Sequence, residues 1–256
     1  HTIALMQSYG NLERIAYEAA VDMHQNNINF YESRYAPFYS VNDDLSPKDV
    51  LTAINSGFKQ AEKEFGIVSG LILCGMRHDP KNVEAVADLA IEYKDLIIGF
   101  DIAGPELNYL PSMYADSFIK VKNKGINITI HAGEGDGVHS IQEALDNGAK
   151  RIGHGVRIIE DISDNDELGP TADHVLQNNI PLEVCITSNL HTNMYRNPQD
   201  HPISRLYNLG FNISLNTDNR LMSNTSIDNE LNVAKIAGIE NPTSLLKYST
   251  SDSFLN

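Results

Sequence analysis

Short apolar runs alternate with longer amphipathic stretches along most of the chain. Ile128 and Ile130 alternate with Asn127 and Thr129, which is the two-residue period of a β-strand. In residues 10–27, apolar side chains recur instead at the spacing of a helix. The same criteria predict seven strands, at residues 28–35, 67–74, 96–104, 126–130, 151–155, 181–186 and 211–218.

The segments between these strands predict helices. Ser46 followed by Pro47 is typical of a helix N-terminus. Ser140 and Glu143 have the spacing of a capping box, and the first residues, HTIALM, are expected to be helical. Further helices are predicted over 80–94, before Gly125, over 171–179 and 203–209, and after Thr225. This alternation of strand and helix indicates a parallel sheet, either doubly wound or closed as a barrel.

The length of 256 residues is ordinary for one α/β barrel, and we expect a single domain over residues 1–256. The polar stretches 160–168 and 187–201 are interpreted as surface excursions of that domain. A (β/α)₈ barrel has eight strands, whereas the pattern contains seven. We therefore expect an incomplete barrel that lacks one strand at its N-terminal side.

Composition narrows the possible partners. The net charge of −15 argues against nucleic acid or an anionic membrane as a partner, and it is compatible with a small neutral or cationic substrate or a metal dication. Cys74 and Cys185 lie in apolar runs and form no C-x-x-C pair, so we expect buried, reduced thiols and a cytoplasmic protein. No apolar run is long enough to predict a membrane span.

Polar and charged side chains recur where the predicted strands end. Because the carboxyl ends of parallel strands form the active-site face of a barrel, we expect these side chains to gather there. The positions in chain order are Arg34, Arg77, His78, Asp101, Gly104, Glu106, His131, Glu134, His154, Ser188, Asn189, Asp218 and Asn219.

Imidazole and carboxylate groups at such an edge are typical of a zinc site that uses no thiolates. His131 and Asp218 are the candidate ligands, although a catalytic zinc normally takes about three ligands from the protein. Glu134, three residues after His131, is the candidate proton shuttle, and His154 is the candidate for orienting a water molecule.

Each candidate also has a structural interpretation. His154, between two glycines, has the pattern of a packed core histidine, Asp218 that of a helix N-cap, and Glu134 that of a solvated loop residue. Solvated roles are expected for the other histidines outside strand ends: His24, His139, His174 and His201.

Three motifs distinguish between these interpretations. TIHAGE (129–134), RIGHG (151–155) and SLNTDN (214–219) resemble, in this order, the signatures of the adenosine deaminase family of metal-dependent amidohydrolases. Supporting matches are ESRYAP (32–37), LILCGMRH (71–78), GFDIAGPE (99–106) and LEVCITSN (182–189), so the resemblance covers nearly the whole chain. It implies a (β/α)₈ TIM-type barrel of which strands two to eight are visible here.

The resemblance also implies roles for single residues. His131 and Asp218 would be ligands of one Zn²⁺, Glu134 would give a proton to the purine ring, and His154 with Asp218 would act on the attacking water. Gly104 and Asn219 would contact the purine. The implied function is zinc-dependent deamination of adenosine or deoxyadenosine to inosine and ammonia in purine salvage.

Two departures from the family pattern keep alternatives open. The family carries an H-x-H pair on its first strand, and this chain contains no H-x-H; we expect that the sequence is partial. Position 219, an Asp in many members, is Asn here, and its amide keeps a donor that does not titrate. The alternatives are deamination of a related aminopurine and a metal-deficient, non-catalytic barrel. Oligomeric state stays open.

Overall fold

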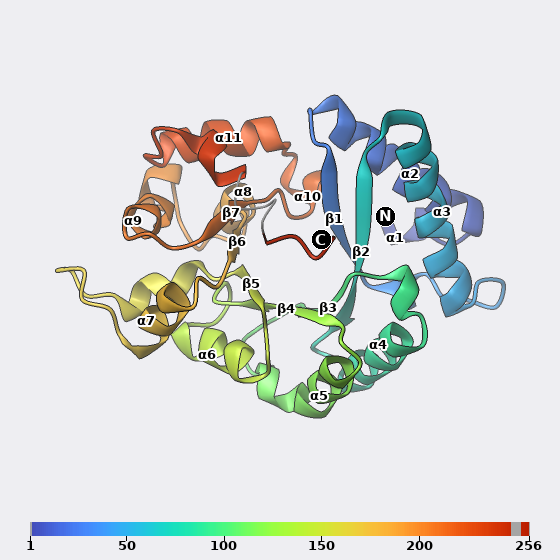
Figure 1. Ribbon diagram of the computed structural model, residues 1–256, viewed down its shortest axis with the longest axis horizontal. Coiled ribbons are helices and arrows are strands. Elements are labelled where there is room, and N and C mark those ends of the chain that lie inside the picture. Colours follow the sequence, from blue (N-terminus) through green and yellow to red (C-terminus); the bar gives the residue numbers. More distant parts are fainter. Residues whose placement is uncertain (1, 247–251, 256) are drawn as a thin grey trace. The chain divides into compact units, whose positions relative to one another are not determined.

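The computed structural model describes residues 2–246 and 252–255, and this part of the chain contains seven parallel strands hydrogen-bonded in the order of the sequence (Figure 1). All seven predicted strands are confirmed. They are β1 Phe30–Tyr35, β2 Val68–Met76, β3 Gly99–Ala103, β4 Asn127–Ala132, β5 Arg151–His154, β6 Leu182–Val184 and β7 Ile213–Leu215. A doubly wound sheet reverses its strand order at a switch point, and no reversal occurs among these strands, so the order is that of a (β/α) barrel.

Helices follow the strands along the chain, as the sequence predicts. They are α1 Thr2–Leu5, α2 Tyr9–Gln25, α3 Pro47–Phe65, α4 Pro80–Glu92, α5 Ala115–Asn123, α6 Val138–Asp146, α7 Pro170–Gln177, α8 Ile186–His191, α9 Ile203–Asn208, α10 Arg220–Ser223 and α11 Ile227–Ile236. Short 3₁₀ turns cover Pro37–Tyr39, Lys94–Leu96, Pro111–Tyr114, Val156–Asp161, Pro198–Asp200 and Pro242–Ser244. No described helix is both long and apolar enough to cross a membrane.

The chain divides into two compact units, one of residues 1–104, 114–128 and 254–256 and the other of residues 105–113 and 129–253. The prediction of a single domain stays a prediction. In the first unit, β1 pairs with β2 and β2 with β3, and α2 and α3 pack together beside them (Figure 1). Ser46 caps α3 in a capping box with Asp49, which confirms the predicted helix start.

Two buried charged side chains, Asp101 on β3 and Arg77 just after β2, belong to the first unit. Arg34 Nε on β1 lies 2.6 Å from Asp101 Oδ2 on β3, and the Asp101 side chain is fully buried. Arg77, also fully buried, donates to the carbonyl oxygen of Ile102 at 3.2 Å. Cys74 and Cys185 are both buried, as predicted, and burial is the main cause that raises the pKa of the Cys74 thiol well above its usual value.

The second unit contains the rest of β4, β5, β6 and β7, with α6 to α11 (Figure 1). Ile130, Ile152, Val184 and Ile213 on its strands are fully buried. Arg151 Nε lies 2.7 Å from Glu183 Oε1, and Thr129 donates to the other oxygen of Glu183 at 3.0 Å, so the buried carboxylate is satisfied.

Two predictions for this unit are wrong. Helix α6 begins at Val138 with Gly137 as its N-cap, so Ser140 is a buried helix residue and caps nothing. The stretch 187–201 is not simply a surface excursion, because α8 covers its first residues, and Thr187, Ser188 and Asn189 are buried. Polar residues that are satisfied inside a site look the same in sequence as solvated ones.

Candidate active site

Four of the predicted site residues, His131, Glu134, His154 and Asp218, belong to the second unit. His131 is on β4, His154 is the last residue of β5, and Asp218 follows β7. The His131 and His154 ring centroids are 5.2 Å apart, and His154 Nε2 lies 3.5 Å from Glu134 Oε2. The structure therefore brings His131, Glu134 and His154 together at the ends of adjacent strands.

The turn after β4 requires a glycine. Gly133 has a φ of +72°, and a Cβ at this position would lie 2.5 Å from the Ile141 side chain. Glu106 then holds the turn, because its buried carboxylate accepts the backbone N–H of Glu134 at 3.3 Å and of Asp136 at 2.6 Å. These contacts fix the backbone from which the Glu134 side chain extends.

Two of the candidate residues have strained backbone conformations. His154 has a φ of +61° and Asp218 a φ of +53°, in the left-handed region that non-glycine residues rarely adopt. Such conformations cost about 1–3 kcal/mol each and persist where the surrounding structure holds them, often at functional sites. The strain supports a role for both residues beyond simple packing.

Asp218 interacts with groups from neighbouring strands. Ser188 Oγ donates to Asp218 Oδ2 at 2.6 Å. Desolvation acts to raise the pKa of Asp218, but the nearby His154 charge, the Ser188 hydrogen bond and the His131 charge outweigh it and lower the pKa. The lowered pKa favours the ionised form of the Asp218 carboxylate.

Asn219 is exposed and forms the N-cap of α10. Its Oδ1 accepts the backbone N–H of Met222 at 3.1 Å, so a helix cap uses the oxygen end of this amide. The cap role that the sequence suggested for Asp218 thus belongs to the next residue. Gly104, with a φ of +100°, lies in the first unit, next to the side chains of His78 and Met76.

The described part of the chain contains no group of three or more His, Cys, Asp or Glu side chains placed to hold a metal ion. One imidazole, His131, and one carboxylate, Asp218, are donors of the kind that zinc takes. The described residues therefore fit part of a zinc coordination sphere, not a complete one.

Two further buried residues belong to this site: Asn189, which the sequence placed at a strand end without a role, and His201. Asn189 is fully buried, and its Nδ2 lies 3.1 Å from His154 Nδ1 and 3.3 Å from Glu134 Oε1. His201, expected to be solvated, is only 3% exposed, and its Nε2 lies 3.3 Å from Asn189 Oδ1. In the sequence, only the position of Asn189 just past a predicted strand indicated a place in the site. His201 follows a polar stretch, and no periodicity marks it.

Helix α11 supports the segment that carries Ser188 and Asn189. Glu230 on α11 is fully buried, and its carboxylate accepts the Thr187 backbone N–H at 3.2 Å and the Thr225 hydroxyl at 2.7 Å. A buried carboxylate with two donors is a stable anchor. It fixes the start of α8, from which both polar side chains project.

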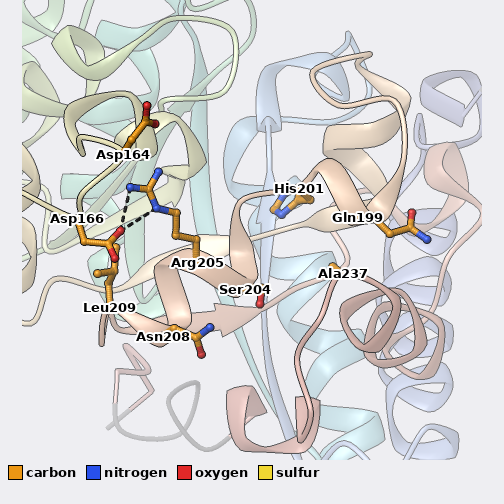
Figure 2. A pocket seen from close by; sticks show the side chains of 9 residues that line it. All are labelled: Asp164, Asp166, Gln199, His201, Ser204, Arg205, Asn208, Leu209 and Ala237. Atoms are coloured by element: carbon orange, nitrogen blue, oxygen red, sulfur yellow. Dashed lines mark hydrogen bonds and ion pairs between the residues drawn. The ribbon is translucent and has the colours of Figure 1, made fainter.

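A separate polar pocket lies on the same unit (Figure 2). Arg205 on α9 forms an ion pair with Asp166 at 2.9 Å there, drawn as dashed lines in Figure 2. His201 is part of the pocket wall, whereas His131, Glu134, His154 and Asp218 do not line it. The pocket therefore meets the candidate active site at His201.

Comparison with known proteins gives the family. The family model described as adenosine deaminase matches residues 1–242. This chain belongs to the adenosine deaminase family. The resemblance predicted from the three motifs is thereby confirmed.

The chain matches part of the length of its curated relatives. It is 42% identical over 241 residues to adenosine deaminase 1 of Streptomyces coelicolor, covering 90% of this chain and 61% of that protein. The chain therefore spans about three-fifths of the length of this curated relative.

Solved structures show the fold. A cog1816 amidohydrolase from Burkholderia ambifaria with bound zinc superimposes with a TM-score of 0.89 at 22% identity, covering 99% of this chain and 72% of that one. An adenine deaminase from Arthrobacter aurescens gives 0.87 at 20% identity, covering 97% and 75%. The (β/α) barrel predicted from the sequence is thus confirmed as the fold.

Proposed function

We propose that the protein carrying this chain deaminates adenosine or deoxyadenosine hydrolytically, giving inosine or deoxyinosine and ammonia. The single observation that carries the proposal is the grouping of Glu134 and His154 beside His131, in a chain that belongs to the adenosine deaminase family. Such a pair provides an acid–base group and an imidazole within reach of one substrate atom.

In this reaction water adds to C6 of the purine, a proton reaches N1, and the amino group leaves as ammonia. Glu134 is the residue proposed to carry the proton to N1, because it extends from a turn that Gly133 and Glu106 hold in place. The His154 ring, next to the Glu134 carboxylate, orients the attacking water by hydrogen bonding. Asn219 and Gly104 stay our candidates for contacts with the purine.

We further propose that His131 and Asp218 are two of the ligands of one Zn²⁺. The support is the chemistry of the two side chains, their places on β4 and just after β7, and the lowered pKa of Asp218. When bound, zinc acts as a Lewis acid that makes water a stronger nucleophile near neutral pH. A role in purine salvage and a cytoplasmic location stay predictions.

The test is a comparison of adenosine, deoxyadenosine and adenine as substrates for the purified protein, with ammonia and the deaminated purine product measured together. A matched sample is treated with a chelator and then supplied with Zn²⁺. We expect turnover of the nucleosides, loss of turnover with the chelator and recovery with zinc. Turnover of adenine alone would favour the related aminopurine, and a metal-free protein without turnover would favour a non-catalytic barrel.

A further inference from the structure

Asn189 connects His201 to the two candidate acid–base residues. Its side chain has one acceptor, Oδ1, and two N–H donors on Nδ2. Nδ2 faces His154 Nδ1 at 3.1 Å and Glu134 Oε1 at 3.3 Å, while Oδ1 faces His201 Nε2 at 3.3 Å. The residue is fully buried, so water cannot replace a lost partner easily. Both Oδ1 and Nδ2 of this amide therefore have hydrogen-bond partners within the site.

The His201 ring determines which way the amide points. The backbone N–H of Ile203 donates to His201 Nδ1 at 3.2 Å, so Nδ1 carries no proton. The proton of the neutral ring is then on Nε2, which donates to Asn189 Oδ1. Burial, with a smaller effect from His154, lowers the pKa of His201 to about 3, and the ring is neutral near pH 7. A turned amide would place its N–H₂ group against this donor.

The same logic fixes the ring of His154. Because Asn189 Nδ2 donates to His154 Nδ1, this ring nitrogen is the acceptor and Nε2 carries the ring proton. This nitrogen lies 3.5 Å from Glu134 Oε2, while Asn189 approaches Glu134 Oε1. Asn189 Nδ2 thus approaches one oxygen of Glu134 directly. Through its hydrogen bond to His154, Asn189 also orients the ring whose Nε2 approaches the other oxygen.

Packing holds the outer end of the network. Tyr195 lies edge-on to His201, with ring centroids 4.9 Å apart, and the pocket of Figure 2 lies at His201. His201 Nε2 is hydrogen-bonded to Asn189 Oδ1, so Asn189 connects the His201 ring to Glu134 and His154.

We propose that Asn189 and His201 are positioning residues that fix the Glu134 carboxylate and the His154 ring relative to each other for proton transfer. This inference rests on the proposed function. It assigns a role to one buried amide and to one histidine that the sequence predicted to be solvated.

The kinetic test uses Asn189→Ala, His201→Phe and the double variant, with adenosine as substrate. Loss of alignment should lower kcat on the order of 10-fold or more in each single variant, with little change in KM. Because His201 acts through Asn189, the double variant should be no slower than Asn189→Ala. His201→Gln, which restores a side-chain N–H donor, should recover part of the loss. If the kcat losses of the two single variants multiply in the double variant, or if His201→Gln recovers none of the loss, the proposal is wrong.

Asn212→Ala is the matched control. Asn212 is 3% exposed and donates to Asp252 Oδ2 at 2.8 Å, but it lies just before β7, away from the strand's carboxyl end. This variant should lose stability and keep its kcat. A kcat loss equal to that of Asn189→Ala would mean that any buried amide has the same effect, and the positioning role would be wrong.

A crystal structure of His201→Phe tests the inference without any activity. We expect a turned Asn189 amide or a changed separation between Glu134 and His154. Unchanged positions of all three side chains would overturn the inference even if the protein is active. An unmodified protein that deaminates no nucleoside would instead contradict the proposed function, and this structure would still decide the positioning role.

Discussion

The Ser188 hydroxyl donates a 2.6 Å hydrogen bond to Asp218 Oδ2. Ser188 follows β6 and Asp218 follows β7, and these two strands pair directly. The bond holds one oxygen of the carboxylate that we propose as a zinc ligand. It also helps to keep Asp218 ionised, because a hydrogen bond to the charged form lowers the pKa.

Ser188→Ala should therefore weaken zinc binding by the protein on the order of 10-fold, as expected when a ligand loses its orienting partner. Competition with a chromophoric chelator measures the affinity. Ser214→Ala is the control, since Ser214 is buried on β7 and its hydroxyl donates to the Leu182 carbonyl oxygen instead. Equal affinities for both variants would remove Asp218 from the proposed ligands.

His201 should make the protein sensitive to acid. Its pKa is about 3 in the folded state and 6.5 in an unfolded chain, so between these values the unfolded state binds more protons. The free energy of unfolding then falls as the pH decreases from about 6.5 toward about 3, and it is unaffected by this group above that window.

Between about pH 7 and about pH 5, the unmodified protein should lose about 2 kcal/mol more stability than His201→Phe. Urea denaturation of both proteins at the two pH values measures the difference. Parallel losses in the two proteins would show that His201 is protonated in the folded state or is not buried in solution.

Two ion pairs of similar length in the first unit should differ in how much they contribute to the free energy of unfolding, because only one of them includes a buried side chain. Arg34 and Asp101 lie 2.6 Å apart with Asp101 fully buried, whereas Arg14 and Glu18 lie 2.7 Å apart with side chains 75% and 52% exposed. Asp101→Asn should lower the free energy of unfolding by about 3 kcal/mol, because Arg34 loses its buried partner.

Glu18→Gln should change the same quantity by less than about 1 kcal/mol, because water screens an exposed pair. Chemical denaturation of both variants gives the comparison. Similar losses for the two would mean that the Arg34–Asp101 pair is solvated in the folded protein.

The sequence predicted the strands well because period and apolar content are local properties. It placed His131, Glu134 and His154 at strand ends, and the structure brings these three together. Helix starts were less predictable. Ser46 caps α3 as expected, whereas Ser140 is inside α6, because Gly137 already ends the preceding turn.

The partners of the site residues were not predictable from the sequence. Asn189 and His201 are polar residues in a polar stretch, and only the folded chain shows that both are buried. The positive φ of His154 and of Asp218 also depends on contacts between strands that lie far apart in sequence. Local patterns carry no information about such contacts.

The most direct test of the proposed chemistry is the variant Glu134→Gln, measured on one preparation for deamination rate, zinc content and binding of a purine ligand. Gln keeps the size of the side chain and removes the transferable proton, with exposed Glu167→Gln as the control. We predict that kcat falls roughly 10²-fold or more, while zinc content and purine binding stay near those of the unmodified protein. Near-normal deamination by Glu134→Gln would contradict the assignment of Glu134 as the proton carrier.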